Sequence, residues 1–224
     1  LKHKAYSFIN LSGLVVGLTS FVLITLYVQQ QLSYDEFHEN GDRIYRISDG
    51  KSAITPNIIA PLLKRNFTEE VEETARAIFM GRQIFNLEAT SFTASVFHVD
   101  PGFLDMFTFP LASGNGETAL DQPNSLIISR REARNRFGTE DVVNRTLKVS
   151  GRNYTITGVL ADIPDNSLLK FDYLAPFQDL TWARGEHWSN WSYHTFLQLA
   201  PGVERDAFEQ KARAMLNKAL EVKA

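Results

Sequence analysis

Cysteine is absent from the 224-residue sequence, so a disulfide framework is excluded. Any folded domain must therefore be stabilised by its hydrophobic core alone. Hydrophobic residues make up 44% of the chain, which is enough for a domain of ordinary size. If that domain lies outside the cytoplasm, the lack of disulfides favours a bacterial envelope over a secreted eukaryotic setting.

An excess of charge of one sign is also missing. Twenty-three Lys and Arg residues stand against 26 Asp and Glu, for a formal net charge of −3, and the two signs are interspersed. There is thus no basic footprint for nucleic acid. The chain contains no His-Glu-x-x-His zinc motif, no Gly-x-Ser-x-Gly nucleophile elbow and no clustered carboxylate–histidine spacing. The sequence therefore predicts no catalytic residues, no metal ligands and no cofactor.

Charge is missing altogether from Ala5 to Tyr34. The apolar centre of this stretch, Phe8 to Val28, is long enough to cross a bilayer, because a hydrocarbon core of about 30 Å needs about 20 helical residues. Tyr6 and Tyr27 would then lie near the two membrane interfaces, and no proline interrupts the run. We therefore predict a transmembrane helix.

A cleaved signal peptide is an alternative interpretation, because Lys2 and Lys4 precede the run. However, the apolar region of a signal peptide is usually about 7 to 15 residues long, and this run ends in glutamines without a small-x-small cleavage pattern. A buried helix of a soluble protein is disfavoured by the same length. The retained anchor is preferred, and the two lysines predict a cytoplasmic N-terminus with the residues after about Tyr34 outside.

Two features of the anchor are candidate functional positions. Gly13 and Gly17 form a Gly-x-x-x-Gly pattern, at which a second helix can approach closely, although glycine is common in transmembrane helices in any case. Beyond the apolar core, Gln29, Gln30, Gln31 and Leu32 include no helix breaker. A helix from Ala5 to Leu32 would be about 42 Å long against a core of about 30 Å, so these four residues are predicted to form a short stalk.

The remainder of the chain interleaves strands and helices and predicts an α+β or mixed α/β fold. Ser33 to Glu36 reads as a capping box that starts a short helix ending at Asn40-Gly41, and Ser129 with Glu132 reads as a second capping box. Residues 113–116 are predicted to form a loop. An apolar cluster is predicted to pack beneath a loop; its members are Phe103, Met106, Phe107, Phe109 and Leu111. Strands are predicted at 43–48, 75–80, 83–87, 92–99, 126–128, 146–149, 154–160, 171–177 and 193–199.

One group of polar and aromatic residues permits two interpretations. His187 and His194 lie close in sequence to Trp188, Trp191 and Tyr193, and the group could line a metal or sugar site. Aromatic residues are buried so commonly that packing, or a surface loop, is the favoured interpretation.

Several short segments follow one another in a characteristic order and spacing. They are Asn10–Leu14, Leu32–His38, Arg43–Arg46, Val99–Phe107, Asn124–Ser129, Phe137–Gly138 and Tyr154–Pro164. Each is weak alone, but together they span nearly the whole chain. In this respect the sequence resembles permeases of the MacB/FtsX-like ABC transporter family.

The resemblance implies a first transmembrane helix followed by a periplasmic core domain of two lobes. Residues 1–34 would comprise a cytoplasmic flank, the transmembrane helix and the short stalk, and residues 35–224 the periplasmic domain. The membrane-proximal lobe would contain residues 43–83 and 168–220. Residues 84–167 would form a second lobe inserted into the first.

The resemblance also implies a function. The chain would couple cytoplasmic ATP hydrolysis to the movement of envelope cargo, such as a lipoprotein, a peptide or a drug, in the bacterial inner membrane. It would not itself be an enzyme, in agreement with the missing Gly-x-x-x-x-Gly-Lys-Ser/Thr motif. The implied partners are a cytoplasmic ABC ATPase, a second permease copy or paralogue as a dimer, membrane lipid, and a periplasmic adaptor or cargo protein.

A membrane-anchored sensor domain that binds a ligand outside the cell is the alternative function. The chain begins at Leu1 without a Met and reads as a piece of a longer protein. Three further transmembrane helices beyond Ala224 would favour the permease, and a long helix pair leading into signalling modules would favour the sensor.

Overall fold

The computed structural model describes residues 2–48, 50–183 and 185–221. The chain divides into two compact units. The first, here called the anchor unit, contains Leu1–Phe37 together with Pro164–Leu169. The second, the domain unit, contains His38–Ile163 and Lys170–Ala224. The predicted mixed α/β class with an apolar N-terminal helix is confirmed.

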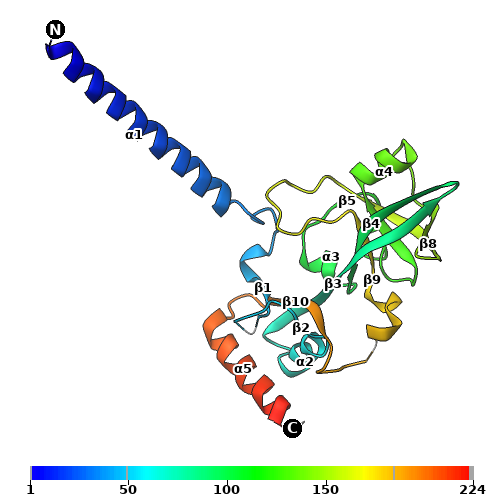
Figure 1. The fold of residues 1–224 in the computed structure, drawn as a ribbon. Helices are drawn as coiled ribbons and strands as arrows, with labels where there is room; N and C mark the ends of the chain where they lie inside the picture. The colour runs from blue at the N-terminus through cyan, green and yellow to red at the C-terminus, as the bar shows by residue number, and fades with distance from the viewer. Residues whose placement is uncertain (1, 49, 184, 222–224) are drawn as a thin grey trace. The chain divides into compact units, whose positions relative to one another are not determined.

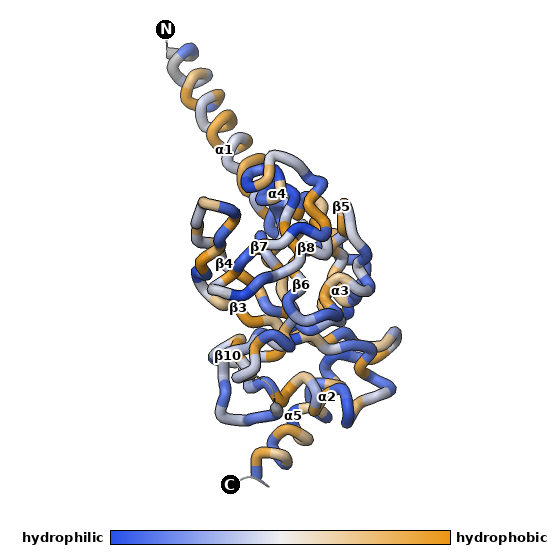
Figure 2. The backbone as a smooth tube through the Cα atoms, turned by 90° about the vertical axis from the view of Figure 1, so that its right-hand side faces the viewer, coloured by the Kyte–Doolittle hydropathy of each residue, from blue (hydrophilic) through white to orange (hydrophobic). Residues whose placement is uncertain are grey.

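The anchor unit is dominated by one long helix, α1 (Lys2–Leu32). Its 31 residues correspond to about 46 Å at about 1.5 Å per residue. Within Tyr6–Leu32, the most apolar 18-residue window has a mean hydropathy of 2.1 and none of it is buried, and Figure 2 shows the apolar colour along the helix. By length and composition, α1 is able to cross a membrane, and it continues without a break through Leu32.

The chain after Leu32 does not form the short helix predicted from Ser33. Residues 33–37 form turns, and the next helical element is a 3₁₀ turn, η1 (Gly41–Arg43). Two features explain the error. The Ser33 hydroxyl donates backwards to the carbonyl of Gln30 at 3.0 Å. Asp35 has a φ of +60°, a left-handed conformation that a right-handed helix cannot include.

The domain unit is built on a ten-stranded sheet with the order β1-β10-β3-β4-β9-β6-β8-β5 (Figure 1). In addition, β2 pairs with β10, and β7 pairs with β3 and β8. The strands are β1 (Ile44–Arg46), β2 (Thr55–Pro56), β3 (Val71–Leu87), β4 (Thr90–Val99), β5 (Leu111–Gly114), β6 (Ser125–Ser129), β7 (Thr146–Val149), β8 (Arg152–Leu160), β9 (Tyr173–Pro176) and β10 (Trp191–Leu199).

Two strands differ from the sequence prediction. The segments expected at 75–80 and 83–87 are one 17-residue strand, β3, whose register with β4 shifts between Phe79 and Arg82. Such a bulge bends a strand without ending it. Residues 113–114 belong to β5 instead of a loop. Gly114 permits this pairing, because a Cβ there would lie 2.4 Å from the carbonyl oxygen of Thr157 on β8.

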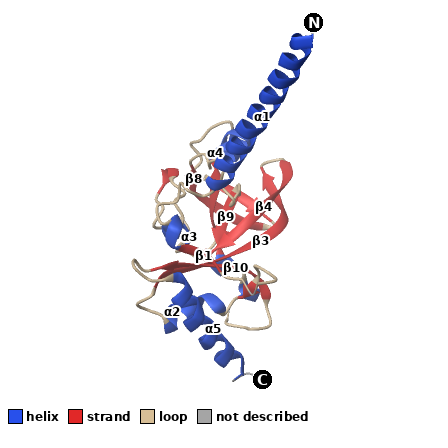
Figure 3. Cartoon of the chain, turned by 90° about the vertical axis from the view of Figure 1, so that its left-hand side faces the viewer, coloured by secondary structure: helices blue, strands red, loops and turns tan. Residues whose placement is uncertain are grey.

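Helices pack on the sheet in two places. Near β10, α2 (Ile59–Asn66) and α5 (Arg205–Glu221) lie on the same face of the sheet (Figure 3). They form an apolar core with that strand; its buried members are Ile59, Leu63, Val71, Leu197, Leu199, Phe208 and Ala212.

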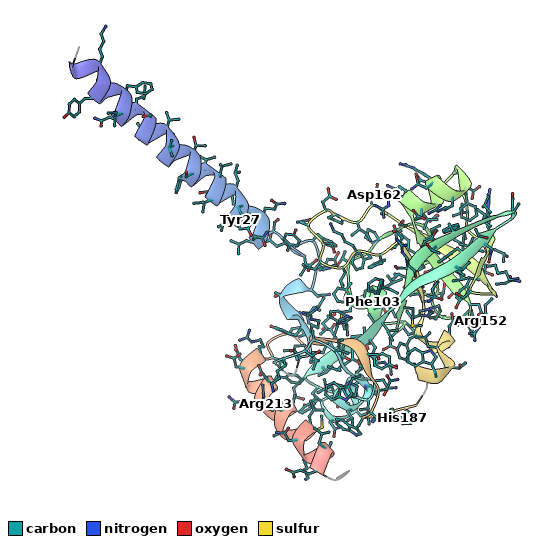
Figure 4. The ribbon with its side chains drawn as sticks, viewed as in Figure 1. Tyr27, Phe103, Arg152, Asp162, His187 and Arg213 are labelled. Atoms are coloured by element: carbon teal, nitrogen blue, oxygen red, sulfur yellow. The ribbon has the colours of Figure 1, made fainter. Side chains whose placement is uncertain are left out.

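The cluster predicted to pack beneath a loop is also buried at four of its five positions, and its Phe103, in α3 (Phe103–Met106), lies among aromatic rings (Figure 4).

A second core surrounds α4 (Arg130–Phe137). As predicted, the Ser129 side chain accepts the backbone N–H of Glu132 at 3.2 Å, and Gly138 ends the helix in the left-handed conformation. The second hydrogen bond of a capping box, from the backbone N–H of Ser129 to the Glu132 carboxylate, is replaced by one to the carbonyl of Asp172. Instead, the Glu132 carboxylate accepts the Tyr173 hydroxyl at 3.0 Å and the Arg136 guanidinium at 2.9 Å. Burial, together with this carboxylate, raises the pKa of Tyr173, so the hydroxyl stays neutral and donates.

An ion pair at the end of β4 ties it to β3. The Arg76 guanidinium contacts both oxygens of Asp100 at 2.8 and 2.9 Å, and the backbone N–H of Arg76 donates to the same carboxylate at 2.8 Å. Both side chains are less than one-fifth exposed. The guanidinium also lies 4.1 Å from the centre of the Phe177 ring.

We predict that Asp100→Ala lowers the free energy of unfolding by about 3 kcal/mol, because a largely buried guanidinium and an N–H lose their acceptor. The matched control is Glu209→Ala, which removes the exposed partner of Arg213 on α5 (Figure 4) and should cost at most about 0.5 kcal/mol. Urea unfolding of the detergent-solubilised chain, followed by tryptophan fluorescence, measures both values. Equal losses would show that the Arg76–Asp100 pair has no special role.

Candidate functional site at the end of the membrane helix

The end of α1 is closed by the residue that follows it. The backbone N–H of Ser33 donates to the carbonyl of Gln29 at 3.1 Å, and its hydroxyl donates to the carbonyl of Gln30 at 3.0 Å. Carbonyls of a last helical turn have no partner within the helix itself. Ser33 therefore satisfies two of these groups and keeps the glutamines in helical geometry.

A loop from far along the sequence completes this closure. Residues 164–169, here called the joint loop, belong to the anchor unit together with α1. The Asn166 side-chain amide donates to the backbone carbonyl of Ser33 at 2.5 Å and lies 3.4 Å from its hydroxyl. In return, the Asn166 carbonyl accepts the backbone N–H of Asp35 at 3.0 Å.

Asp35 makes the second half of the contact. Its carboxylate accepts the backbone N–H of Leu168 at 2.9 Å and lies 3.3 Å from the hydroxyl of Ser167, which is itself almost fully buried. A hydrogen bond to an ionised acceptor is stronger than one between neutral groups. We call these five contacts between residues 33–35 and residues 166–168 the clasp.

The backbone conformation of Asp35 suits this role. At a φ of +60° most residues are strained, whereas Asp and Asn tolerate this region well. The turn reverses the chain directly after α1 and presents the carboxylate to the joint loop. Sequence reasoning missed both Asp35 and Asn166 as functional candidates, because their partners lie more than 130 positions away.

The positions singled out from the sequence lie on α1. Around Gly13 and Gly17, no atom lies within 4 Å of the place that a Cβ would occupy, so this side of the helix is open. Gln29 to Leu32 are exposed and helical, and they lead directly into the clasp. The glycine pair and these four residues do not converge on one site. Their roles in helix packing and as a stalk stay predictions.

The histidine and tryptophan group does not converge on a ligand site. The backbone N–H of His187 donates to the buried side chain of Asn57 at 2.8 Å, and the His194 ring lies 3.3 Å from the carbonyl of Ala53. Within residues 2–48, 50–183 and 185–221, no three His, Asp or Glu side chains are arranged to hold a metal ion. Within the group, Tyr193 is buried and Trp191 is exposed, so packing describes one part of it and a surface position the other.

Trp188 and Trp191 instead line an apolar groove of about 620 Å³ in the domain unit. The groove runs between α5, α2 and the strands β1 and β10; its apolar lining includes Tyr45, Ile47, Ile59, Leu197, Phe208 and Leu216. Its volume lies within the range of about 300–1,000 Å³ that is typical of small-molecule sites. Leu220, near the end of α5, is 46% exposed at this groove.

The structure thus combines a helix able, by length and composition, to cross a membrane with a mixed α/β domain. The family model of the MacB-like periplasmic core domain matches residues 7–215. The chain therefore belongs to the family of MacB-like periplasmic core domains, which are parts of ABC transporter permeases rather than enzymes. Membership implies partnership with an ABC ATPase, and the apolar helix together with this type of domain indicates the inner membrane.

Solved structures agree with this assignment. A permease-protein domain from Porphyromonas gingivalis is 29% identical with a TM-score of 0.67, and the match covers 79% of this chain and 84% of that one. The periplasmic region of MacB from Actinobacillus actinomycetemcomitans is 14% identical with a TM-score of 0.58, covering 79% and 82%. The extracellular domain of the noncanonic ABC-type transporter YknZ from Gram-positive bacteria is 15% identical with a TM-score of 0.56, covering 80% and 93%. The last two show likeness of fold.

A comparison with the sequences of curated proteins gives no significant match.

Proposed function

We propose that this part of the permease transmits ATP-driven movement from the membrane to envelope cargo outside it. The observation that supports this proposal is the continuity of α1. The helix runs unbroken from the length needed to cross a membrane through Gln29–Leu32 and ends directly in the clasp. A helix is stiff because its backbone bonds are internal, so a tilt or push applied at one end reaches the other.

The length of α1 supports a stalk outside the lipid. At about 46 Å it exceeds a hydrocarbon core of about 30 Å by about a third of its length. We propose that Gln29 to Leu32 lie in this excess, on the periplasmic side. We further propose that the N-terminus is cytoplasmic, since Lys4 precedes the apolar run and basic residues remain inside.

The organisation of the domain unit supports the proposal of two lobes. The core that contains α2 and α5 draws its buried members only from residues 43–83 and 168–220. The core around α4 draws most of its members from residues 84–167, with Tyr173 and Ala175 added from β9. We propose that cargo or a periplasmic adaptor contacts these lobes, and that a second permease copy or paralogue packs against Gly13 and Gly17.

A ligand-binding sensor is the second candidate function, and the apolar groove beside α5 favours it. A groove of about 620 Å³ that is lined by aromatic and aliphatic side chains is suited to a small apolar ligand. In that case the anchor would hold a receptor at the membrane, and mechanical continuity through the stalk would be unnecessary.

The proposed orientation predicts a labelling pattern. A cysteine at Ala89, in the exposed turn between β3 and β4, should react with a membrane-impermeant maleimide in intact spheroplasts. A cysteine at Lys4 should react only after permeabilisation. The chain has no cysteine of its own, so each signal reports one site. Labelling of position 4 in intact spheroplasts with protection of position 89 would reverse the proposed topology.

The proposed role of the stalk predicts an effect on coupling. In the full-length permease with its ATPase in lipid nanodiscs, energy transfer from a dye at position 89 to an acceptor lipid follows movement of the domain relative to the membrane. Replacing Gln29 to Leu32 with Gly-Ser-Gly-Ser should leave ATP hydrolysis nearly unchanged and reduce the ATP-dependent signal at least fivefold, roughly the lower bound of typical coupling between sites.

The matched control replaces the same four residues with alanine, which keeps the helix. This variant should retain the ATP-dependent signal of the natural protein. A full signal from the Gly/Ser variant would show that the domain is a tethered binding module, as the sensor hypothesis requires.

A further inference from the structure

We infer that the joint loop is a second point at which α1 acts on the domain, and that Asp35 and Asn166 are the positioning residues that hold it there. This inference rests on the proposed mechanical function and names the part of the chain that receives the movement. It follows from the chain connections between the two units, from the strands that those connections enter, and from the contacts at the two ends of the loop.

The chain passes between the anchor unit and the domain unit three times, at 37/38, 163/164 and 169/170. The first passage is the direct continuation of α1. The other two flank the joint loop, which the clasp connects with the helix end. Without the clasp, movement of α1 would reach the domain unit through the 37/38 passage alone. With the clasp, it also reaches the domain unit through the passages at 163/164 and 169/170.

The three passages enter different parts of the sheet. The direct continuation leads through η1 into β1, the first strand in the sheet order. The joint loop follows β8 and precedes β9, which lie on either side of β6 toward the other end of that order. A movement of the helix end therefore reaches two separate regions of the sheet, and can turn the sheet as well as pull on it.

Both ends of the loop connection are fastened to the start of α4. At one end, Asp162 accepts the Arg130 guanidinium at 2.8 Å. At the other end, Asp172 accepts the Arg131 guanidinium at 2.8 and 2.9 Å, and it also accepts the Ser129 hydroxyl at 2.9 Å. Three consecutive residues thus hold both ends, so displacement of the loop is passed to α4 and its core. This arrangement gives the arginine-rich start of that helix a role.

The test uses the full-length permease with its ATPase in nanodiscs and the energy-transfer signal from position 89 described above. Asp35→Gly keeps the left-handed conformation but removes the carboxylate, and Asn166→Ala removes the donor to Ser33. The double variant should hydrolyse ATP at the natural rate, and its ATP-dependent energy-transfer signal should fall at least roughly fivefold. The control pair Asp141→Gly and Asn115→Ala, at exposed loop positions, should keep the full signal.

A reversible cross-link separates coupling from mere stability. Ser33→Cys combined with Asn166→Cys, in the Asp35→Gly variant, replaces the side-chain contacts of the clasp by two thiols in a chain without other cysteines. The dye is then attached through a non-natural amino acid at position 89. The ATP-dependent signal should be low in the free-thiol form, return when a short reducible bis-thiosulfonate linker joins the pair, and fall again on reduction. A structural role alone would not follow the state of the linker.

The outcomes separate this inference from the proposed function. A full signal from the Gly/Ser stalk variant would contradict the mechanical function itself. The signal could instead be lost in the Gly/Ser stalk variant but full in both the Asp35→Gly/Asn166→Ala and the free-thiol variants. That result would contradict only the inference that the clasp transmits movement, and would leave the mechanical function in place. If the double variant fails to fold by circular dichroism, Asp35→Gly and Asn166→Ala are tested one at a time, and a full signal from both single variants contradicts the inference.

Discussion

Every backbone group of a membrane-crossing helix must be satisfied within the helix until the chain leaves the lipid. In the last turn of α1, where the internal hydrogen bonds run out, Ser33 donates to the carbonyls of Gln29 and Gln30, and its own carbonyl accepts the Asn166 side-chain amide. The residue that closes the helix is thus held in turn by a loop between β8 and β9, far along the sequence. This single constraint makes the joint loop part of the anchor unit, and it gives α1 more than one connection to the domain.

The family assignment and this local geometry support each other at different levels. A MacB-like periplasmic core domain is a component that works with an ABC ATPase, and no catalytic role is needed of its residues. Under the proposed mechanical function, such a component requires stiffness between the membrane and the domain. The unbroken α1, the left-handed turn at Asp35 and the contacts from Asp162 and Asp172 to the start of α4 each provide it. The apolar groove beside α5 is the feature that a purely mechanical function leaves unused.

Local patterns in the sequence predicted the elements well. The uncharged run gave α1, and Ser129 with Gly138 marked both ends of α4, because these signals depend only on neighbouring residues. The two misses at the end of α1 arise from how its last turn is closed. Ser33 resembles the start of a helix, but its hydroxyl is used to close the preceding one. Asn166 gives no local sign of its role, since its partner lies 133 residues away and only the folded chain brings the two together.

The central claim is that the end of α1 and the joint loop move as one body. Spin labels at Gln30 and Leu168, both exposed, measure this most directly in the full-length permease with its ATPase. Electron–electron distance distributions would be recorded without nucleotide and with ATP trapped at the ATPase. The account predicts one narrow distribution that is the same in both states. A broad distribution, or a distance that shifts when ATP binds, would contradict it.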